Sequence, residues 1–286
     1  MKTLSLRSPA KLNLFLKVLR KRKDGYHSLE TLFERIDLCD HIRLSGNTEG
    51  VIRIFCDHPD VPRDSRNLVY QAVRLVREEF GVADGIDIQI TKRIPVAAGL
   101  GGGSSNAAAA LLGVNRLWRL KMTRKKLLAL ARKIGSDVGF FIHHCSWAEG
   151  RGRGDRITRL KIPARLWHIL VVPALKVYSK GVFEARHNER LTKPGDDVRI
   201  FTRFLRKNDC SAIEVLLRND LEQAIVRLHP QLLSLKKDIA HLVQRPVLFS
   251  GSGPALFALA RSGQEAWDLK AVLDRDDCQV FIVRTL

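Results

Sequence analysis

Residues 95–106 read Pro95-Val-Ala-Ala-Gly-Leu-Gly-Gly-Gly-Ser-Ser-Asn106. Before this stretch, Ile86, Ile88 and Ile90 alternate with polar residues, which is typical of a strand. After it, an Ala- and Leu-rich stretch to about residue 117 favours a helix. A glycine loop between a strand and a helix lets backbone N–H groups converge on an anion, because no Cβ intervenes and the helix presents its positive end. The stretch therefore predicts a phosphate-binding loop.

Other glycine-rich loops fit these residues less well. No Gly-Lys-Ser/Thr closes the loop, so it is not a Walker A motif, and its spacing and place in the chain exclude a Rossmann fingerprint. A plain turn with a serine cap is the structural alternative, but four glycines in five residues carry an entropy cost that such a turn does not need. Ser104 and Ser105 could cap the helix, bind a phosphate oxygen or ligate Mg²⁺.

Hydrophobic periodicity outlines the rest of the first half. Leu12, Leu14, Leu16 and Val18 alternate as in a strand. A helix is expected over residues 65–80, with Asp64 or Ser65 as its cap and Gly81 at its end, and a second helix over residues 123–134.

The second half reads as a ferredoxin-like α+β arrangement. An apolar run at 167–172 predicts a strand, and a glycine-rich turn at 250–254 joins two further strands. We expect helices near 197–206, 219–243 and 264–273, and strands at 246–249, 255–259 and 279–284. With a boundary near residues 155–165, the predicted domains are 1–160 and 161–286.

Composition bounds the class of protein. The chain has 286 residues and 45% hydrophobic content, enough for a sizeable core. Its five cysteines are scattered without a CxxC pair, which favours a reducing compartment over a disulfide framework or zinc site. No run of about 18 apolar residues is present, so we expect a soluble, cytoplasmic protein without a membrane span. His143-His144-Cys145 is not interpreted as a metal site, since no other ligand cluster is near it in sequence.

The formal net charge is +19, and residues 116–133 hold eight basic residues and no acidic one. Such a surface attracts nucleic acid, acidic lipid or phosphorylated small molecules. The plainer interpretation is a solvated basic face, because Leu117, Leu120, Leu127 and Leu130 fall at helical spacings suited to packing. Arg151-Gly-Arg-Gly-Asp155 is interpreted as a basic hairpin or linker, with an RNA-binding patch as the alternative.

Three motifs resemble those of the GHMP kinases. Residues 95–106 resemble the ATP-binding loop of that superfamily, Phe249-Ser-Gly-Ser-Gly-Pro-Ala255 its C-terminal glycine motif, and Pro9-Ala-Lys-Leu-Asn-Leu14 its first motif. The resemblance implies an α+β two-domain GHMP kinase fold, with a ribosomal protein S5 domain 2-like N-terminal domain and a ferredoxin-like C-terminal domain. It also implies an enzyme that uses ATP and Mg²⁺ and binds its substrate in the cleft between the domains.

Asp24-Gly-Tyr-His27 and Gly135-Ser-Asp-Val138 resemble the members that phosphorylate a small-molecule cytidine diphosphate substrate. The resemblance implies a catalytic pair, Lys11 and Asp137, with Asp137 accepting the substrate hydroxyl proton. It implies ATP contacts at Asn67, Pro95, Val96, Ala97, Ala98, Gly99, Leu100, Gly101, Gly102, Gly103, Ser104 and Ser105. It implies substrate contacts at Asn13, Tyr26, His27, Ser179, Phe183, Gly251, Ser252 and Gly253, with Tyr26 and Phe183 stacking on the cytosine.

The chain departs from the family pattern at a few positions. Gly139 stands where proline is usual, Tyr178 where a small residue is usual, and Lys176 and Lys180 add charge. Two other functions stay open: a GHMP kinase acting on homoserine or mevalonate-type alcohols, and an RNA-binding protein with the N-terminal fold. We expect no nucleic acid and no membrane among the partners, and the sequence leaves monomer or homodimer open.

Overall fold

The computed structural model describes residues 2–186 and 197–286, and these form two compact units. The first unit holds residues 2–10, 38–96 and 101–145, and the second holds 11–37, 97–100 and the described residues from 146 onward. Two long strands, β1 (Thr3–Lys21) and β2 (His27–Asn47), contribute to both units. The units are thus interleaved in sequence and do not coincide with the ranges 1–160 and 161–286, and that division into domains stays a prediction.

The first unit has a sheet in which buried apolar residues alternate with more exposed residues along β4. β4 (Gly85–Thr91) pairs antiparallel with residues 41–47 of β2 and parallel with β3 (Ile52–Cys56). Ile86, Ile88 and Ile90 of β4 are buried, as their spacing predicts. The predicted strand before the glycine loop is therefore confirmed.

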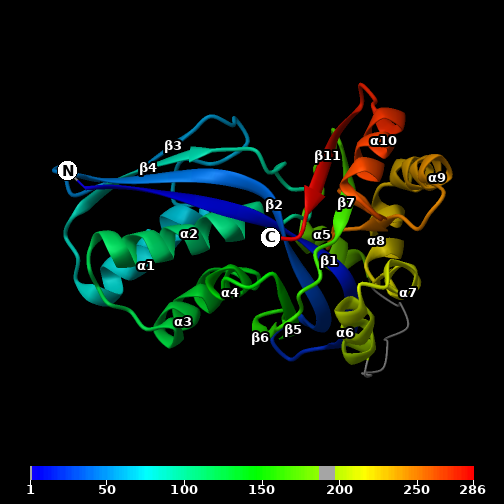
Figure 1. Cartoon of the computed structure of the whole chain (residues 1–286). Coiled ribbons are helices and arrows are strands. Elements are labelled where there is room, and N and C mark those ends of the chain that lie inside the picture. Colours follow the sequence, from blue (N-terminus) through cyan, green and yellow to red (C-terminus); the bar gives the residue numbers. More distant parts are fainter. Residues whose placement is uncertain (1, 187–196) are drawn as a thin grey trace. The chain divides into compact units, whose positions relative to one another are not determined.

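Four helices of the first unit lie together on one side of these strands (Figure 1). Helix α2 approaches the strands closely at Gly113, where a Cβ would lie 2.2 Å from Leu44 Cδ1 and 2.9 Å from Leu6 Cδ1. The helices are α1 (Leu68–Phe80), α2 (Gly102–Leu117), α3 (Arg124–Ile134) and α4 (Val138–Ile142).

The first helix begins later than its sequence predicts. Asn67 is the N-cap of α1, its side chain accepting from the N–H of Val69, so the caps expected at Asp64 or Ser65 were wrong. The physical reason is that the carboxylate of Asp64 accepts hydrogen bonds from the backbone N–H and the guanidinium of Arg66, which closes a turn ahead of the helix. The expected end at Gly81 is confirmed, with φ +63°.

The second unit contains a four-stranded antiparallel sheet in the order β11-β7-β10-β9. Numbered by their succession in the chain, these strands lie in the order 4-1-3-2, the ferredoxin-like arrangement that the sequence predicts. Their bounds are β7 (Trp167–Pro173), β9 (Leu248–Phe249), β10 (Leu256–Ala260) and β11 (Cys278–Arg284).

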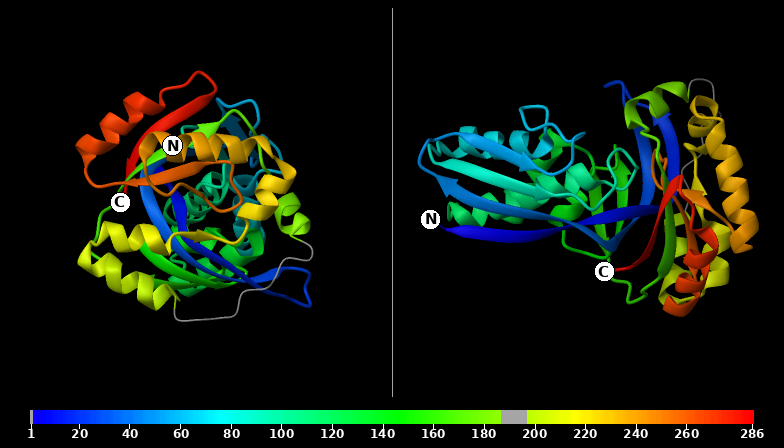
Figure 2. Two further views of the ribbon diagram at one scale, coloured as in Figure 1. Left: turned by 90° about the vertical axis from the view of Figure 1, so that its right-hand side faces the viewer. Right: turned by 90° about the horizontal axis from the view of Figure 1, so that it is seen from above.

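Helices cover one face of this sheet. In the right-hand view of Figure 2, α9 and α10 (yellow-orange to orange-red) lie to the right of β7 (green) and β11 (red). The core between them includes Ile169, Val171 and Phe249 of the sheet and Ile225 and Ile239 of the helices. The helices of this unit are α5 (Ser179–Ala185), α6 (Asp197–Lys207), α7 (Cys210–Leu216), α8 (Glu222–Leu228), α9 (Gln231–Val243) and α10 (Gly263–Leu273).

One helix expected in this unit is broken in two. The pattern over 219–243 predicts a continuous helix, but α8 ends at Leu228 and α9 begins at Gln231. Pro230 is the N-cap of α9. Because proline has no backbone N–H, it cannot continue the hydrogen bonding of α8, and the helix is interrupted there. The strand expected over 246–249 is likewise shorter, since only Leu248 and Phe249 pair with β10.

Two smaller pairings complete the second unit. The two-residue strand β8 (Arg218–Asn219) pairs parallel with β1 at Phe15 and Leu16. The strands β5 (Trp147–Gly152) and β6 (Arg156–Leu160) form a hairpin, which confirms a hairpin for the basic stretch 151–155. No helix within 2–186 and 197–286 is both long enough and apolar enough to cross a bilayer.

Candidate active site

The glycine loop has a backbone conformation that residues other than glycine rarely adopt. Ala97, Gly99 and Gly101 all have positive φ angles, of 55°, 77° and 70°. Gly99 has no room for a side chain, because a Cβ there would lie 2.1 Å from the carbonyl oxygen of Ser250 in the same unit. The loop therefore requires glycine at position 99 on grounds of both conformation and space.

The start of α2 supports the phosphate interpretation of the loop. The N-cap is Gly101, which has no side chain, so neither serine caps the helix. Ser105 is buried and accepts a hydrogen bond of 2.8 Å from the hydroxyl of Ser8, whereas Gly103 is exposed and Ser104 half-buried. The helix thus presents an N-terminal turn without a side-chain cap, an arrangement that suits an anion.

A buried carboxylate that the sequence analysis did not identify holds the backbone just before the glycine loop. Asp40, with no exposed surface, accepts hydrogen bonds of 2.8 Å from the backbone N–H groups of both Arg93 and Ile94. It also forms an ion pair with the ammonium group of Lys92. A single sequence carries no signal for this contact, because 52–54 residues separate the partners.

Lys11 and Asn13 form a buried polar pair on β1. Their side chains are 4% and 2% exposed, and Lys11 Nζ donates to Asn13 Oδ1. Asn13 Nδ2 donates to Thr31 Oγ1 at 2.7 Å, and Lys11 Nζ lies 5.9 Å from the centroid of the Phe33 ring. A buried ammonium group held in this way can stabilise negative charge that develops on a reacting group.

The C-terminal glycine turn packs directly against this pair. A Cβ on Gly251 would lie 3.0 Å from Lys11 Nζ, 3.1 Å from Asn13 Oδ1 and 3.3 Å from the carbonyl oxygen of Gly99. The turn is also bonded to the glycine loop, since the Ala255 N–H donates to the Ala98 carbonyl at 3.3 Å. The structure therefore brings together Lys11, Asn13, residues 97–100 and residues 251–253.

The residues predicted to bind cytosine lie near the start of β2 and on α5. His27 stacks on Phe183, with ring centroids 6.0 Å apart and planes inclined by 21°. Tyr26 is 55% exposed, and the guanidinium of Arg153 from the β5–β6 turn lies 4.9 Å from its ring centroid. Ser179 is exposed, and its hydroxyl is 2.7 Å from that of buried Ser252. Arg153 was not predicted to take part.

The carboxylate of Asp24 stabilises the turn before Tyr26 by accepting two kinds of hydrogen bond. Arg22 donates to the carboxylate of Asp24 at 2.9 Å, and the Tyr26 N–H donates to Asp24 at 3.2 Å. These hydrogen bonds, the one from Arg22 first, lower the pKa of Asp24 below its ordinary value. Asp24 is therefore ionised at neutral pH and holds the turn that carries Tyr26.

Asn67, the pair Pro95 and Val96, and Asp137 lie in the first unit, as do residues 101–105 of the glycine loop. Asn67 is buried, and besides capping α1 its Nδ2 donates to the Pro62 carbonyl at 2.7 Å. Pro95 and Val96 are half-buried. Asp137 is the half-buried N-cap of α4, and the next residues, including Gly139, are buried.

The predicted residues thus divide between the units. Those in the first unit are Asn67, Pro95, Val96, Gly101, Gly102, Gly103, Ser104, Ser105 and Asp137. Those in the second unit are Lys11, Asn13, Tyr26, His27, Ala97, Ala98, Gly99, Leu100, Ser179, Phe183, Gly251, Ser252 and Gly253.

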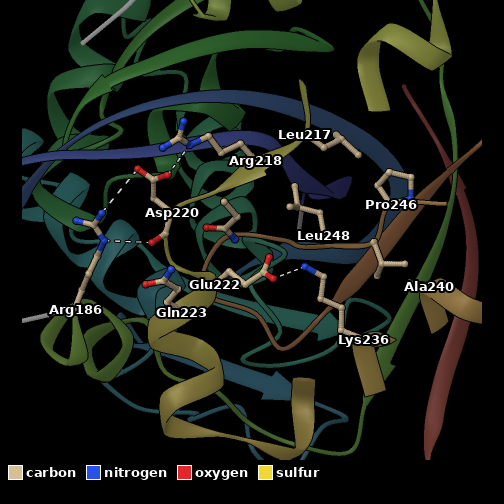
Figure 3. Close-up of a pocket in the computed structure, with 12 residues that line it drawn as sticks. Arg186, Leu217, Arg218, Asp220, Glu222, Gln223, Lys236, Ala240, Pro246 and Leu248 are labelled. Carbon is tan, nitrogen blue, oxygen red and sulfur yellow. Dashed lines mark hydrogen bonds and ion pairs between the residues drawn. The ribbon is translucent and has the colours of Figure 1, made fainter. Parts of the chain in front are cut away.

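A cavity of about 710 Å³ lies elsewhere in the second unit, near β8, α8 and α9 (Figure 3). Its charged groups are paired: Asp220 lies between Arg186 and Arg218, and Glu222 contacts Lys236. Among the described residues that line it, none is a predicted site residue. The cavity is therefore not the predicted active site.

The basic stretch 116–133 is solvated, as expected. Seven of its eight basic residues are exposed, and the half-buried Lys126 forms an ion pair with Glu79. The apolar residues Leu127 and Leu130 face the core.

Comparisons with known proteins show the family and the fold. Residues 67–144 match the family model described as "GHMP kinases N terminal domain". A 4-diphosphocytidyl-2-C-methyl-D-erythritol kinase of Geobacillus kaustophilus (strain HTA426) is 41% identical over 284 residues, which cover 99% of this chain and 97% of the relative. A solved 4-(cytidine 5'-diphospho)-2C-methyl-D-erythritol kinase is 33% identical, with a TM-score of 0.80, over 98% of this chain and 99% of that one.

A homoserine kinase from Cytophaga hutchinsonii shares the fold, with a TM-score of 0.74 at 23% identity over 100% of this chain and 95% of that one. The two glycine motifs, the fold and the family model define a kinase of the GHMP class, a class that uses ATP, and they confirm the predicted fold class. Within this class, the chain belongs to the family of the 4-diphosphocytidyl-2-C-methyl-D-erythritol kinases.

Proposed function

We propose that this chain transfers the γ-phosphoryl group of ATP to the 2-hydroxyl of 4-diphosphocytidyl-2-C-methyl-D-erythritol, in the methylerythritol phosphate route to isoprenoid precursors. The observation that carries the proposal is the 41% identity, over 99% of the chain, to a kinase of that name. The homoserine kinase neighbour has only 23% identity and supports the fold alone. Cytoplasmic localisation, as expected from composition, is part of the same proposal.

The proposed chemistry assigns a role to each catalytic residue. Asp137 accepts the proton of the 2-hydroxyl, whose oxygen forms a bond to the γ-phosphorus. The bond from the γ-phosphorus to the β,γ-bridging oxygen breaks, and ADP leaves. Lys11, buried and held by Asn13, stabilises the charge on the transferring group. Phosphoryl transfer depends mainly on this kind of positioning and charge stabilisation.

ATP is proposed to bind at the glycine loop. Backbone N–H groups of residues 95–105 and the N-terminus of α2 hold the phosphates, and Asn67 lies by the adenine. The positive φ angles of Gly99 and Gly101 and the helix without a side-chain cap support this assignment.

Mg²⁺ is proposed to accompany the triphosphate. Within the described residues, no group of three or more His, Cys, Asp or Glu side chains could hold a metal ion by itself. Mg²⁺ is usually held by one or two side chains together with substrate phosphates. The hydroxyl of Ser104, half-buried in the first turn of α2, is the side chain that would hold it together with the phosphate oxygens. Bound there, it would neutralise charge on the phosphate oxygens.

The acceptor is proposed to lie against the second unit's residues. Asn13, Ser179 and the Gly251–Gly253 turn position the alcohol, and Tyr26, His27 and Phe183 recognise the cytosine. The stacked contact of His27 and Phe183 and the exposed ring of Tyr26 support this assignment.

A panel of alcohols tests the proposed function. The purified chain is incubated with γ-labelled ATP, Mg²⁺ and one acceptor: the cytidine diphosphate compound, homoserine or mevalonate. We expect label to transfer only to the cytidine diphosphate compound. Transfer to homoserine or mevalonate instead would show that the family assignment does not extend to the substrate.

We also propose that the basic face of residues 116–133 does not bind nucleic acid. Changing the exposed Arg124, Lys125 and Arg132 of α3 together to glutamine should leave kinase activity within about twofold, because exposed charges are screened within about 8–10 Å at physiological salt. A saturable RNA complex of the parent chain, with a steep salt dependence that the triple change abolishes, would refute this.

A further inference from the structure

The short strand β8 carries a buried amide that the proposed mechanism does not use. Asn219 is 7% exposed and pairs with Leu16 of β1 in parallel register. Its Nδ2 donates to the carbonyl oxygens of Phe249 at 2.8 Å and Gly251 at 2.7 Å. Its Oδ1 accepts from the Leu221 N–H at 2.9 Å.

The partners determine how this amide is oriented. The two carbonyl oxygens can only accept and the backbone N–H can only donate, so the NH₂ group must face the glycine turn. One N–H of the amide therefore binds the end of β9 at Phe249 and the other binds the turn at Gly251, 30 and 32 residues away in sequence. A carboxylate would keep the acceptor for Leu221 but lose both donors.

The turn that Asn219 holds is the one packed on Lys11 and Asn13. Gly251 has a φ of +57°, and a Cβ on it would lie within about 3.1 Å of a polar atom of each. The space between Gly251 and these two side chains is therefore too small for a methyl group, so a shift of the turn toward Lys11 and Asn13 would displace them.

Further contacts within the second unit connect Asn13 to the strand that carries Asn219. Asn13 Nδ2 donates to Thr31 Oγ1, and Thr31 Oγ1 donates to the Phe15 carbonyl, each at 2.7 Å. Phe15 and Leu16 pair with β8, the strand that carries Asn219. Asn219 thus holds the glycine turn from β8, and β8 pairs with β1, the strand that carries Lys11 and Asn13.

We propose that Asn219 is a positioning residue for the phosphoryl transfer: it sets the glycine turn and, through it, Lys11 and Asn13. The proposal rests on the proposed function, because it requires these two residues to act in the reaction. The competing explanation is that Asn219 only stabilises the fold, as many buried amides do.

The test compares Asn219→Asp with a matched control, Thr202→Val. Thr202 lies in the same unit, is 5% exposed and donates one hydrogen bond of 2.6 Å to the Val198 carbonyl, and neither residue is a predicted site residue. Both variants should lose some thermal stability. Only Asn219→Asp should lose kcat/KM for the acceptor, by about 10- to 100-fold, roughly 1.4–2.7 kcal/mol at 1.36 kcal/mol per decade. Asn219→Ser, which is too short to reach both carbonyls, replaces it if the aspartate variant does not fold.

A double-mutant cycle separates positioning from stability. If Asn219 acts through Asn13, the losses from Asn219→Asp and Asn13→Ala should add up to clearly more than the loss in the double variant. Purely additive losses, or a folded Asn219→Ser with unchanged kcat/KM, would overturn the proposal.

An NMR measurement tests the positioning role independently of the proposed function. The amide NMR signals of Gly251 and Gly253 should shift in the Asn219 variant and stay in place in Thr202→Val. If the parent chain fails to phosphorylate the acceptor, the proposed function fails, whereas unshifted glycine signals would refute the positioning role itself.

Discussion

His27 and Phe183 stack on each other, with their ring centroids 6.0 Å apart and their planes 21° from parallel. The imidazole therefore lies against Phe183 with a lateral offset, and Arg153 lies over one face of Tyr26. In the proposed site, a cytosine base would stack on the faces that these groups leave open. Two rings sandwiching the base stay a prediction, and each of those rings has one side-chain neighbour in the structure.

Tyr26 is the ring whose removal should affect acceptor binding most selectively. Base stacking on an aromatic side chain contributes about 1–3 kcal/mol. Tyr26→Ala should raise the acceptor KM roughly 5- to 150-fold and leave the KM for ATP nearly unchanged. Phe55→Ala is a suitable control, since Phe55 is 51% exposed, close to the 55% of Tyr26, and lies on β3. An unchanged acceptor KM in Tyr26→Ala would remove this ring from the site.

Two glycines of one loop should respond differently to alanine. At Gly99 the Cβ would meet the Ser250 carbonyl at 2.1 Å on a backbone with φ +77°, so Gly99→Ala should lower the Tm by at least roughly 3 °C. At Gly103 the nearest atom is Leu68 Cδ1 at 3.8 Å, and alanine favours the helix. Gly103→Ala should therefore keep its Tm and weaken ATP binding, because its Cβ would stand in the proposed phosphate site. Equal Tm values for the two variants would contradict the geometry of the loop.

Asp137→Asn tests the general base. The substitution keeps the size of the side chain, so circular dichroism and Tm should stay close to those of the parent chain. The kcat should fall roughly 10²- to 10⁴-fold, the usual contribution of general-base catalysis. Asp238→Asn, at an exposed position on α9, should have normal turnover. Normal turnover by a folded Asp137→Asn would assign the proton transfer to another group.

Glu30 should make the folded state pH-sensitive. It is 4% exposed, and burial is the main reason that its pKa lies above the ordinary 4.5. Because the folded-state pKa is raised, the stability associated with protonated Glu30 is present below about pH 4.5 and is lost as the pH rises through the raised pKa. Glu30→Gln should therefore have a higher Tm than the parent chain at pH 7.5, and the difference should shrink at pH 4. A lower Tm at pH 7.5 would show that the nearby Arg151, at 3.5 Å, outweighs the desolvation.

The sequence predicts those parts of the fold that depend on local patterns. The strand at Ile86–Ile90, the helix ending at Gly81 and the glycine loop each follow from the spacing or conformation of neighbouring residues. The ferredoxin-like order in the second unit follows from the succession of its elements. The continuous helix over 219–243 failed because the apolar period runs across Pro230, and the missing N–H of that residue outweighs the period.

The supporting residues of the candidate site could not be predicted in this way. Asp40, Arg153 and Asn219 contact partners 30 or more residues away. Arg153 lies in the basic stretch 151–155, but nothing in the sequence around any of the three indicates the partner. A capping residue or a glycine is determined by its neighbours in the chain, whereas these contacts exist only once the strands have paired. Residue roles carried by the family resemblance, such as those of Lys11 and Asp137, stay predictions until the variants are measured.

The most direct measurement is the kcat/KM of the parent chain for two acceptors that differ only in the cytidylyl group. These are 4-diphosphocytidyl-2-C-methyl-D-erythritol and 2-C-methyl-D-erythritol 4-phosphate, each with saturating ATP and Mg²⁺. We expect phosphorylation of the first to exceed that of the second by at least about 100-fold, since stacking on the open faces contributes about 1–3 kcal/mol and hydrogen bonds to the base contribute further. Equal values for the two acceptors, or no phosphorylation of the cytidine diphosphate compound, would contradict the account.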